Sequence, residues 1–382
     1  MKKIIIGLLF TIGILITNID QEETSLEEVK AVFISYIEIN EYIKNDNYEI
    51  SKSNIRKIIN NIKNMNLNTI ILQVRAASDS IYNSKIYPKS LYLVEEENDS
   101  YYDVLDYFIE EAHKYNVKII AWINPYRVRT TNNIESISKY NPAYKYINTD
   151  TLYIENGIYN NPSKKEVTDL IVKGVEEVLE YKIDGLLFDD YFYPSTKIDE
   201  KDYQEYINSN DYVSPENYRL DVINNMVKKV YKKCKAKNIP FGISPDGNID
   251  NNYNTHYADI KTWMSKDGYI DFIMPQIYYG FYNSSRSYLN TLNEWESYLA
   301  NENIDLYVAL AFYKIGQYDK YAKTGSNEWF ENDNIIMREI LLSRNVKKYK
   351  GFSLFRYDNI FNENVFTNNT VKEIENLKKI IK

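Results

Sequence analysis

The sequence predicts a single-domain α/β protein whose strands close into a (β/α)8 TIM-type barrel with enlarged loops at the C-terminal face. First, short apolar strand-like segments alternate with amphipathic helical segments from residue 30 to residue 382. Such alternation indicates parallel strands joined by right-handed crossovers. Second, eight strand–helix units fit into roughly 350 residues, which suits such a barrel. Third, the segment after the first strand, Ser35-Tyr36-Ile37-Glu38, is not the Gly-rich phosphate turn typical of the alternative, an open doubly wound sheet.

The predicted strands are short apolar runs, rich in β-branched and aromatic residues. The fourth one, Leu186-Leu187-Phe188, must end before Pro194, because proline cannot donate a hydrogen bond to a sheet. In chain order the eight strands are expected at 32–36, 69–75, 118–124, 186–188, 240–245, 270–278, 306–311 and 351–356.

The predicted helices show apolar residues at helical spacing, and some begin with recognisable caps. Asp99 or Ser100 is expected to cap the second helix, and Ser163 with Glu166 matches a capping box. Ser214 followed by Pro215 predicts the start of a long helix. The helices are expected at 54–65, 101–115, 164–181, from 215 onward, and at 257–265, 285–300, 332–343 and 370–381.

The N-terminus predicts export. Two lysines precede an apolar run from Ile4 to Thr17, a pattern typical of a secretory signal. Residues 1–24 are therefore expected to be a signal peptide or an N-terminal membrane anchor, and residues 30–382 the barrel. The run is shorter than a full bilayer span, which favours a cleaved signal. We expect an extracytoplasmic protein of a bacterial cell envelope, which contacts the membrane only through such an anchor.

Composition excludes several classes of function. The net charge of −8 argues against nucleic acid as a partner, because phosphate binding requires concentrated Lys and Arg. A single cysteine and two histidines exclude a thiolate cluster and a His-rich metal site. No metal and no cofactor are therefore expected. The lack of histidine ligands also makes a metal-dependent deacetylase a poor candidate.

Carboxylates and aromatic residues gather where the predicted strands end. Asp189 and Asp190 directly follow the fourth strand, and Tyr191, Phe192 and Tyr193 come next. Active sites of (β/α)8 barrels lie at these C-terminal strand ends. Carboxylates carry out the proton and charge chemistry of glycoside cleavage, and aromatic faces stack on sugar rings. The pattern therefore predicts a site for a neutral, hydroxyl-rich ligand such as a polysaccharide.

Four segments carry a resemblance to a known family. They are Ala121-Trp122-Ile123-Asn124-Pro125-Tyr126-Arg127, Phe188-Asp189-Asp190-Tyr191-Phe192-Tyr193-Pro194, Gly242-Ile243-Ser244-Pro245 and Met274-Pro275-Gln276-Ile277-Tyr278. From about residue 30 to about residue 360 the chain resembles the bacterial glycosyl hydrolase-like family 10. The resemblance implies a (β/α)8 barrel in an envelope protein. It also implies a glycoside hydrolase, since some relatives cleave peptidoglycan glycan strands stripped of stem peptides.

Asp189 is the first choice for a catalytic carboxylate, with Asp190 as its partner. Side chains alternate along a strand, so both cannot point into the barrel mouth while the strand is regular. In the chitinase-type signature Asp-Gly-x-Asp-x-Asp-x-Glu, laid on Asp184-Gly185, the terminal acid falls on Tyr191. The general acid of that pattern is therefore missing, and Asp190 is either a shifted acid or a structural anchor.

The second carboxylate of the reaction stays open. Asp246, just past the fifth strand, is the best-placed candidate, and Glu38, Asp79 and Asp358 are weaker ones. A carboxylate separation of about 5 Å would indicate retention and one of about 6.5–9.5 Å inversion. Catalysis assisted by an N-acetyl group of the substrate is a third route.

Polar and aromatic residues at the other strand ends are expected to bind the sugar. The polar ones would hydrogen-bond hydroxyl, acetamido or carboxylate groups, although Arg75 could instead pair with Asp189 or Asp190. The aromatic ones could form stacking walls or could equally be core. The polar set is Arg75, Asn124, Arg127, Gln276 and Arg356, and the aromatic set is Trp122, Tyr126, Tyr191, Tyr193 and Tyr278.

Two functions remain. The first is an extracytoplasmic glycoside hydrolase acting on an amino-sugar polymer, with peptidoglycan glycan as first choice and an exopolysaccharide such as poly-N-acetylglucosamine as a variant. The second is a non-catalytic glycan-binding barrel in which Asp189 and Asp190 only hold sugar hydroxyls. The missing chitinase-type glutamate favours the second function, and the density of carboxylates and arginines at the strand ends favours the first.

Overall fold

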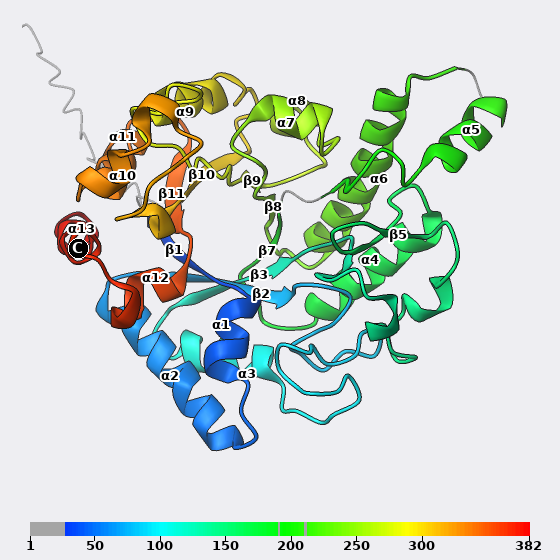
Figure 1. Ribbon diagram of the computed structural model, residues 1–382, viewed down its shortest axis with the longest axis horizontal. Coiled ribbons are helices and arrows are strands. Elements are labelled where there is room, and N and C mark those ends of the chain that lie inside the picture. Colours follow the sequence, from blue (N-terminus) through cyan, green and yellow to red (C-terminus); the bar gives the residue numbers. More distant parts are fainter. Residues whose placement is uncertain (1–26, 190–191, 210–211) are drawn as a thin grey trace, which may run out of the picture.

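The fold is a closed barrel of eight parallel strands, as the sequence predicts (Figure 1). A computed structural model describes residues 27–189, 192–209 and 212–382. The strands follow the order β1-β11-β10-β9-β8-β7-β3-β2 around the barrel. Their bounds are β1 Val29–Ile34, β2 Thr69–Arg75, β3 Lys118–Ile123, β7 Gly185–Phe188, β8 Phe241–Ile243, β9 Phe272–Ile273, β10 Asp305–Leu310 and β11 Tyr349–Leu354.

The sixth barrel strand is much shorter than the expected 270–278. Beyond Ile273 the chain reaches Pro275, which has no N–H group for the ladder. Pairing continues only as isolated bridges from Gln276 to Asp246 and to Ala309. The proline therefore ends the regular strand, and the residues that follow it lie at the mouth of the barrel.

Helices surround the barrel, and several are short (Figure 1). The expected helices are all present, with bounds shifted by a few residues, and α1, α5, α7, α10 and α12 are additional. They are α1 Tyr36–Glu38, α2 Tyr48–Asn64, α3 Val104–His113, α4 Lys165–Val178, α5 Glu200–Ser209, α6 Pro215–Ala236, α7 Ile249–Asn254, α8 Ile260–Ser265, α9 Tyr288–Ser297, α10 Glu328–Glu331, α11 Ile335–Ser343, α12 Tyr357–Phe361 and α13 Asn368–Ile380.

One predicted helix cap is confirmed and two are wrong. The Ser214 side chain accepts a hydrogen bond from the Asn217 N–H, and proline occupies the start of α6. Helix α3 is instead capped by Asp103, whose carboxylate accepts from Asp106 N–H, so it begins after the expected Asp99 or Ser100. No side chain caps α4, because the Ser163 hydroxyl lies 3.0 Å from the Tyr193 hydroxyl instead.

The segment between β3 and α4 is not a plain loop. It contains a three-stranded antiparallel sheet in the order β4-β6-β5, which the sequence did not indicate. Its strands are β4 Arg127–Arg129, β5 Leu152–Ile154 and β6 Ile158–Asn160. The sheet buries a small apolar cluster of its own around Val128 and Ile158, so the enlarged loop is a folded structure beside the mouth.

The core has two layers, which follow from the alternation of side chains along each strand. One layer fills the inside of the barrel and includes Phe33, Ile71, Trp122, Leu187 and Met274. The other lies between the barrel and the helices and is larger. Whether a strand-end residue faces the site therefore depends on which layer it belongs to.

The expected signal segment, residues 1–24, lies outside the described residues. Within the part of the chain that the structure describes, no helix is long and apolar enough to cross a membrane.

Candidate active site

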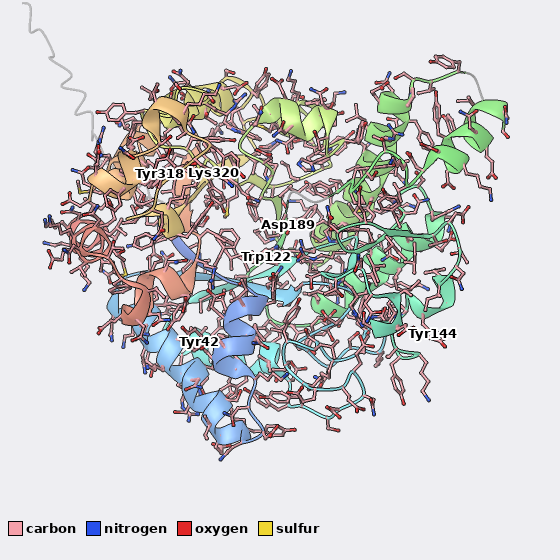
Figure 2. The ribbon with its side chains drawn as sticks, viewed as in Figure 1. Tyr42, Trp122, Tyr144, Asp189, Tyr318 and Lys320 are labelled. Atoms are coloured by element: carbon pink, nitrogen blue, oxygen red, sulfur yellow. The ribbon has the colours of Figure 1, made fainter. Side chains whose placement is uncertain are left out.

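A buried carboxylate lies at the centre of the barrel mouth. Asp189 directly follows β7, and the residue is only 5% exposed. One of its oxygens, Oδ2, accepts hydrogen bonds from the Trp122 indole N–H at 3.2 Å and from the Asn124 amide. Both donors come from β3, the strand next to β7, and Figure 2 shows Trp122 and Asp189 side by side at the barrel centre. The two donors fix the position of the carboxylate in the mouth.

The orientation of Asn124 is fixed by two further residues. Its Oδ1 accepts from Gln73 Nε2 at 2.7 Å and from Arg127 Nη2 at 2.6 Å. The Nδ2 group is therefore left to donate to Asp189. Gln73 is held in turn by the Tyr36 N–H, which donates to Gln73 Oε1 at 2.9 Å. This network joins the ends of β1, β2, β3 and β7.

Arg127 is connected to the carboxylate through Asn124. Its Nε donates to the Ala76 carbonyl at 2.8 Å, and its guanidinium lies 6.0 Å from the Tyr36 ring centre. The contacts fix the position of the guanidinium at the mouth. It remains half-buried, and therefore able to meet a ligand.

Arg75 does not reach the site, contrary to the expectation. A bulge in β2 pairs Gln73 with Trp122 but Arg75 with Ile123, one step further along β3. The Arg75 side chain therefore turns to the outer layer with Ile123, where it lies 4.3 Å from the Tyr87 ring centre and against Gly174 of α4. Neither the predicted sugar contact nor the alternative pairing with Asp189 fits this position.

Two of the expected stacking residues belong to the outer core. Tyr126 is fully buried there. Tyr193 is also buried, and its hydroxyl donates to Asp199 at 2.7 Å. Asp199 forms an ion pair with Arg219 at 2.9 Å. Because these rings are covered by other side chains, the structure assigns them to packing and not to the mouth.

Arg356, after β11, is paired with a carboxylate that follows the neighbouring strand β1. It pairs with Glu38, which is fully buried. Glu38 also accepts from the Ser35 hydroxyl at 2.6 Å and from the Asp358 N–H at 3.2 Å. Glu38 thus joins the ends of β1 and β11, and this engagement explains why it is a poor catalytic candidate.

Asp246 is half-buried and bound by its own loop. Its Oδ1 accepts from Asn248 N–H at 2.7 Å, and its Oδ2 accepts from Asn251 Nδ2 at 3.0 Å. Burial, and secondarily Asp246, raises the pKa of Tyr279. The loop holds Asp246 at the end of β8 beside Gln276, whose amide donates to the Ser244 carbonyl at 3.0 Å.

The other weak carboxylate candidates are also engaged. Asp79 is buried, accepts from the Ser90 hydroxyl at 2.9 Å, and burial raises the pKa of its carboxyl group. Asp358 accepts from the Tyr42 hydroxyl and from Asn362 at 2.9 Å. Asp190 and Tyr191 lie outside the described residues.

Aromatic rings line the mouth beyond Trp122. Tyr278 lies 6.0 Å from both Phe355 and Tyr313, measured between ring centres. Phe33 connects this group to Trp122, at 5.3 Å, and to Phe355, at 5.4 Å. The sequence patterns did not single out Phe33, Gln73, Tyr313 or Phe355 as site residues. Gln73 lies two residues after Ile71, so both side chains point to the inside of the barrel. This alternation could have identified Gln73 from the sequence.

The described residues offer no evident metal site. Among them, no group of three or more His, Cys, Asp and Glu side chains lies together in a way that could hold an ion. A groove of about 880 Å³ does exist, but it lies between α3 and α4 and is lined by residues such as His113, Glu177 and Tyr181. Its lining residues do not include Asp189 or its hydrogen-bond partners.

Comparisons with known proteins confirm the resemblance. The family described as glycosyl hydrolase-like 10 matches residues 28–326. The glycosyl hydrolase YngK of Bacillus subtilis is 32% identical over 321 residues, which are 77% of this chain and 61% of YngK. The glycosyl hydrolase DigH of Escherichia coli is 29% identical over 333 residues, covering 78% of this chain and 74% of DigH. The chain thus spans less than two thirds of the length of YngK.

Solved structures share the fold at low sequence identity. The glycoside hydrolase domain of PgaB (BpsB) from Bordetella bronchiseptica has a TM-score of 0.56 at 10% identity, covering 93% of this chain and 99% of that one. An endo-1,4-beta-mannanase from Rhizomucor miehei has a TM-score of 0.56 at 12% identity, covering 93% and 95%. At such identities the likeness concerns the barrel alone.

Proposed function

Because the chain belongs to the glycosyl hydrolase-like 10 family, we propose that it is an extracytoplasmic glycoside hydrolase that cleaves amino-sugar glycan strands. Denuded peptidoglycan is the first choice of substrate. The observation that carries the proposal is the buried Asp189 carboxylate, held by Trp122 and Asn124 at the mouth of the barrel. The N-terminal sequence pattern supports the location outside the cytoplasmic membrane.

The reaction breaks the bond between the anomeric carbon and the glycosidic oxygen. A general acid gives a proton to the leaving oxygen, the oxygen of a water molecule ends on the anomeric carbon, and the proton lost by that water passes to a carboxylate of the site. We assign Asp189 the charge-bearing role, because its position at the centre of the mouth is fixed by the two donors to Oδ2. As an anion it would stabilise the positive charge that develops on the sugar ring, or orient an acetamido group of the substrate for attack on the anomeric carbon.

The acid must come from a second group. Asp190 is adjacent in sequence, and Asp246 lies at the end of β8. Of the two, Asp246 already accepts hydrogen bonds on both oxygens from its own loop. Both carboxylate oxygens are therefore already engaged within the protein, and Asp246 is less free to meet a leaving oxygen than the sequence suggested. We therefore assign the acid role to Asp190 first and to Asp246 second.

The engagement of Asp246 also favours the second candidate function, a glycan-binding barrel without turnover. In that case Asp189 would accept hydrogen bonds from sugar hydroxyls, and no acid would be required. An exopolysaccharide such as poly-N-acetylglucosamine is a further substrate for the hydrolase, since its sugars carry the same acetamido group.

The test is mass spectrometry of peptide-free peptidoglycan glycan strands after incubation with the purified protein. We expect new short saccharides with the wild type and none with Asp189→Asn. Asp221→Asn, a change at an exposed position of α6, is the matched control and should cleave normally. If the wild type leaves the strands intact but sediments with them, the hydrolase proposal fails and the binding barrel is supported.

A further inference from the structure

Two loops at the C-terminal face carry an unusual number of exposed aromatic rings. The loop after β9 carries Tyr282, and the loop after β10 carries Tyr313, Tyr318, Tyr321 and Phe330; we call these five rings the aromatic platform. Tyr282, Tyr318 and Tyr321 are 63%, 65% and 74% exposed. Among the aromatic residues that the structure describes, only Tyr212, at 77%, is more exposed than these three. Exposed apolar side chains gathered on neighbouring loops mark binding sites more often than single ones do.

The platform rests on a folded base. Buried Glu328 accepts hydrogen bonds from the Phe281 and Tyr282 N–H groups, at 2.9 and 2.8 Å, so the two loops are joined. Lys314 Nζ donates to the Tyr278 carbonyl at 2.8 Å and to Asp319 at 2.7 Å. Because Lys314 and Asp319 are largely shielded from solvent, this pair fixes the loop more firmly than a surface ion pair would.

One ring of the platform, Tyr313, is connected to the mouth of the barrel. From Trp122, the partner of Asp189, ring contacts lead through Phe33 at 5.3 Å and Phe355 at a further 5.4 Å. Phe355 lies 6.1 Å from Tyr313, the first ring of the platform. Figure 2 shows Tyr318 and Lys320 on the β10 side of the labelled Asp189, and Tyr144 on the far side of it.

We propose that the aromatic platform is a distal glycan subsite, which stacks pyranose rings of the same strand whose scissile bond lies at Asp189. The inference rests on the proposed function and adds the location of the strand beyond the mouth. Aromatic faces bind the apolar C–H faces of sugar rings, and the exposed rings of this surface suit a neutral sugar chain. The occupant is a glycan and not a protein, because ring contacts connect Tyr313 to a mouth lined by Asp189, Asn124 and Arg127, and the Lys314–Asp319 pair joins Tyr313 to the segment that carries Tyr318 and Tyr321.

A subsite of this kind acts only on strands long enough to reach it. Removing its rings should therefore weaken the binding of long strands. The binding of short oligosaccharides, which fill only the mouth, should not change. This dependence on chain length distinguishes the platform from residues that contact the sugar at Asp189. Removing one of those residues would weaken the binding of short and long ligands alike.

The experiment compares the double variant Tyr318→Ala/Tyr321→Ala with Tyr140→Ala/Tyr144→Ala. The control pair is also exposed, at 51% and 49%, but lies in the segment between β4 and β5. Binding of peptide-free glycan strands, sorted by length, is measured by isothermal titration calorimetry with Asp189→Asn as background to prevent turnover. For long strands we expect the platform variant to bind about tenfold more weakly, with short strands and the control pair unchanged.

Three results would overturn the subsite. The first is an unchanged affinity of the platform variant for long strands, and the second is an equal loss of affinity for short and long strands. The third is a loss of self-association of the platform variant in sedimentation velocity, which would make the platform an interface between copies.

The two proposals fail separately. If the wild type does not cleave but the length-dependent loss appears, the hydrolase fails and the subsite stands. If the wild type cleaves and the length dependence is absent, the subsite fails alone.

Discussion

The Trp122 indole N–H donates to Asp189 Oδ2 across the β3–β7 pair, at 3.2 Å. The same indole ring packs edge-on against Phe33, 5.3 Å away, inside the barrel. One side chain therefore connects the packing of the barrel interior to the charge at its mouth. Any change in the position of the interior layer would move the hydrogen-bond donor of the carboxylate.

Trp122→Phe should separate these two roles. Phenylalanine keeps an aromatic ring against Phe33 but removes the donor to Asp189. We expect kcat/KM on glycan strands to fall between about tenfold and a hundredfold, the value of a hydrogen bond to a charged group. Initial rates and thermal unfolding are measured together. Trp263→Phe is the control, because it removes a buried indole donor to Asn224 in the outer core layer and leaves the donors to Asp189 in place. If both variants keep the wild-type rate, Trp122 does not support the reaction.

Arg356→Met should destabilise the fold, because it leaves the fully buried Glu38 without its cation. Removing one partner of a buried ion pair costs about 3 kcal/mol. Urea unfolding would report the loss. Arg56→Met, which removes an exposed arginine of α2, should change stability little. Equal effects of the two variants would show that the Glu38 contact contributes nothing beyond a surface charge.

Gly174→Ala tests the position of Arg75. In an open helix this change would stabilise by roughly 1 kcal/mol, because alanine has the higher helix propensity. Here a Cβ at residue 174 would lie 2.1 Å from Arg75 Nη1 and 2.6 Å from the Tyr87 ring. Crowding of this kind costs about 1–3 kcal/mol, so we expect net destabilisation in urea unfolding. A stabilised Gly174→Ala protein would contradict the outward position of Arg75.

A pH-dependent stability is expected from Glu373, a buried residue of α13. Burial raises the pKa of Glu373 from 4.5 to about 7. Backbone N–H groups at the start of α11, such as that of Met337 at 2.8 Å, donate to the carboxylate and partly oppose this rise. Asp333 raises the pKa further, and Glu339 lies in the same α11–α13 interface, where burial and Glu373 also raise its pKa. The protonated form is therefore favoured in the folded state.

The sign follows from proton linkage. Between pH 4.5 and about 7 the folded protein holds a proton on Glu373 that the unfolded chain has lost, so stability falls as pH rises through this window. Glu373→Gln keeps an acceptor for Met337 but cannot ionise. We expect it to be more stable than the wild type at pH 8, and similar to it near pH 4, in urea titrations at both values. An equal difference in the free energy of unfolding between Glu373→Gln and the wild type at both pH values would show that the carboxyl group does not titrate in this way.

The sequence by itself determined the architecture. Alternating apolar runs placed the eight strands, because buried parallel strands and amphipathic helices have different periods. Four motifs identified the family, and the acids after Phe188 located the mouth. Trp122, Asn124 and Arg127 were predicted at the strand ends, and the structure brings all three to Asp189, directly or through Asn124.

Only the tertiary structure decided which side of the barrel wall each strand-end side chain faces. One extra residue in β2 turns Arg75 outward, and Pro275 ends β9 early. Tyr193 is drawn to Asp199, six residues further along the chain, and away from the mouth. A single step in register reverses a side chain, and that step depends on hydrogen bonds between strands that lie far apart in the sequence. Local residue patterns do not contain this information, and the packed barrel does.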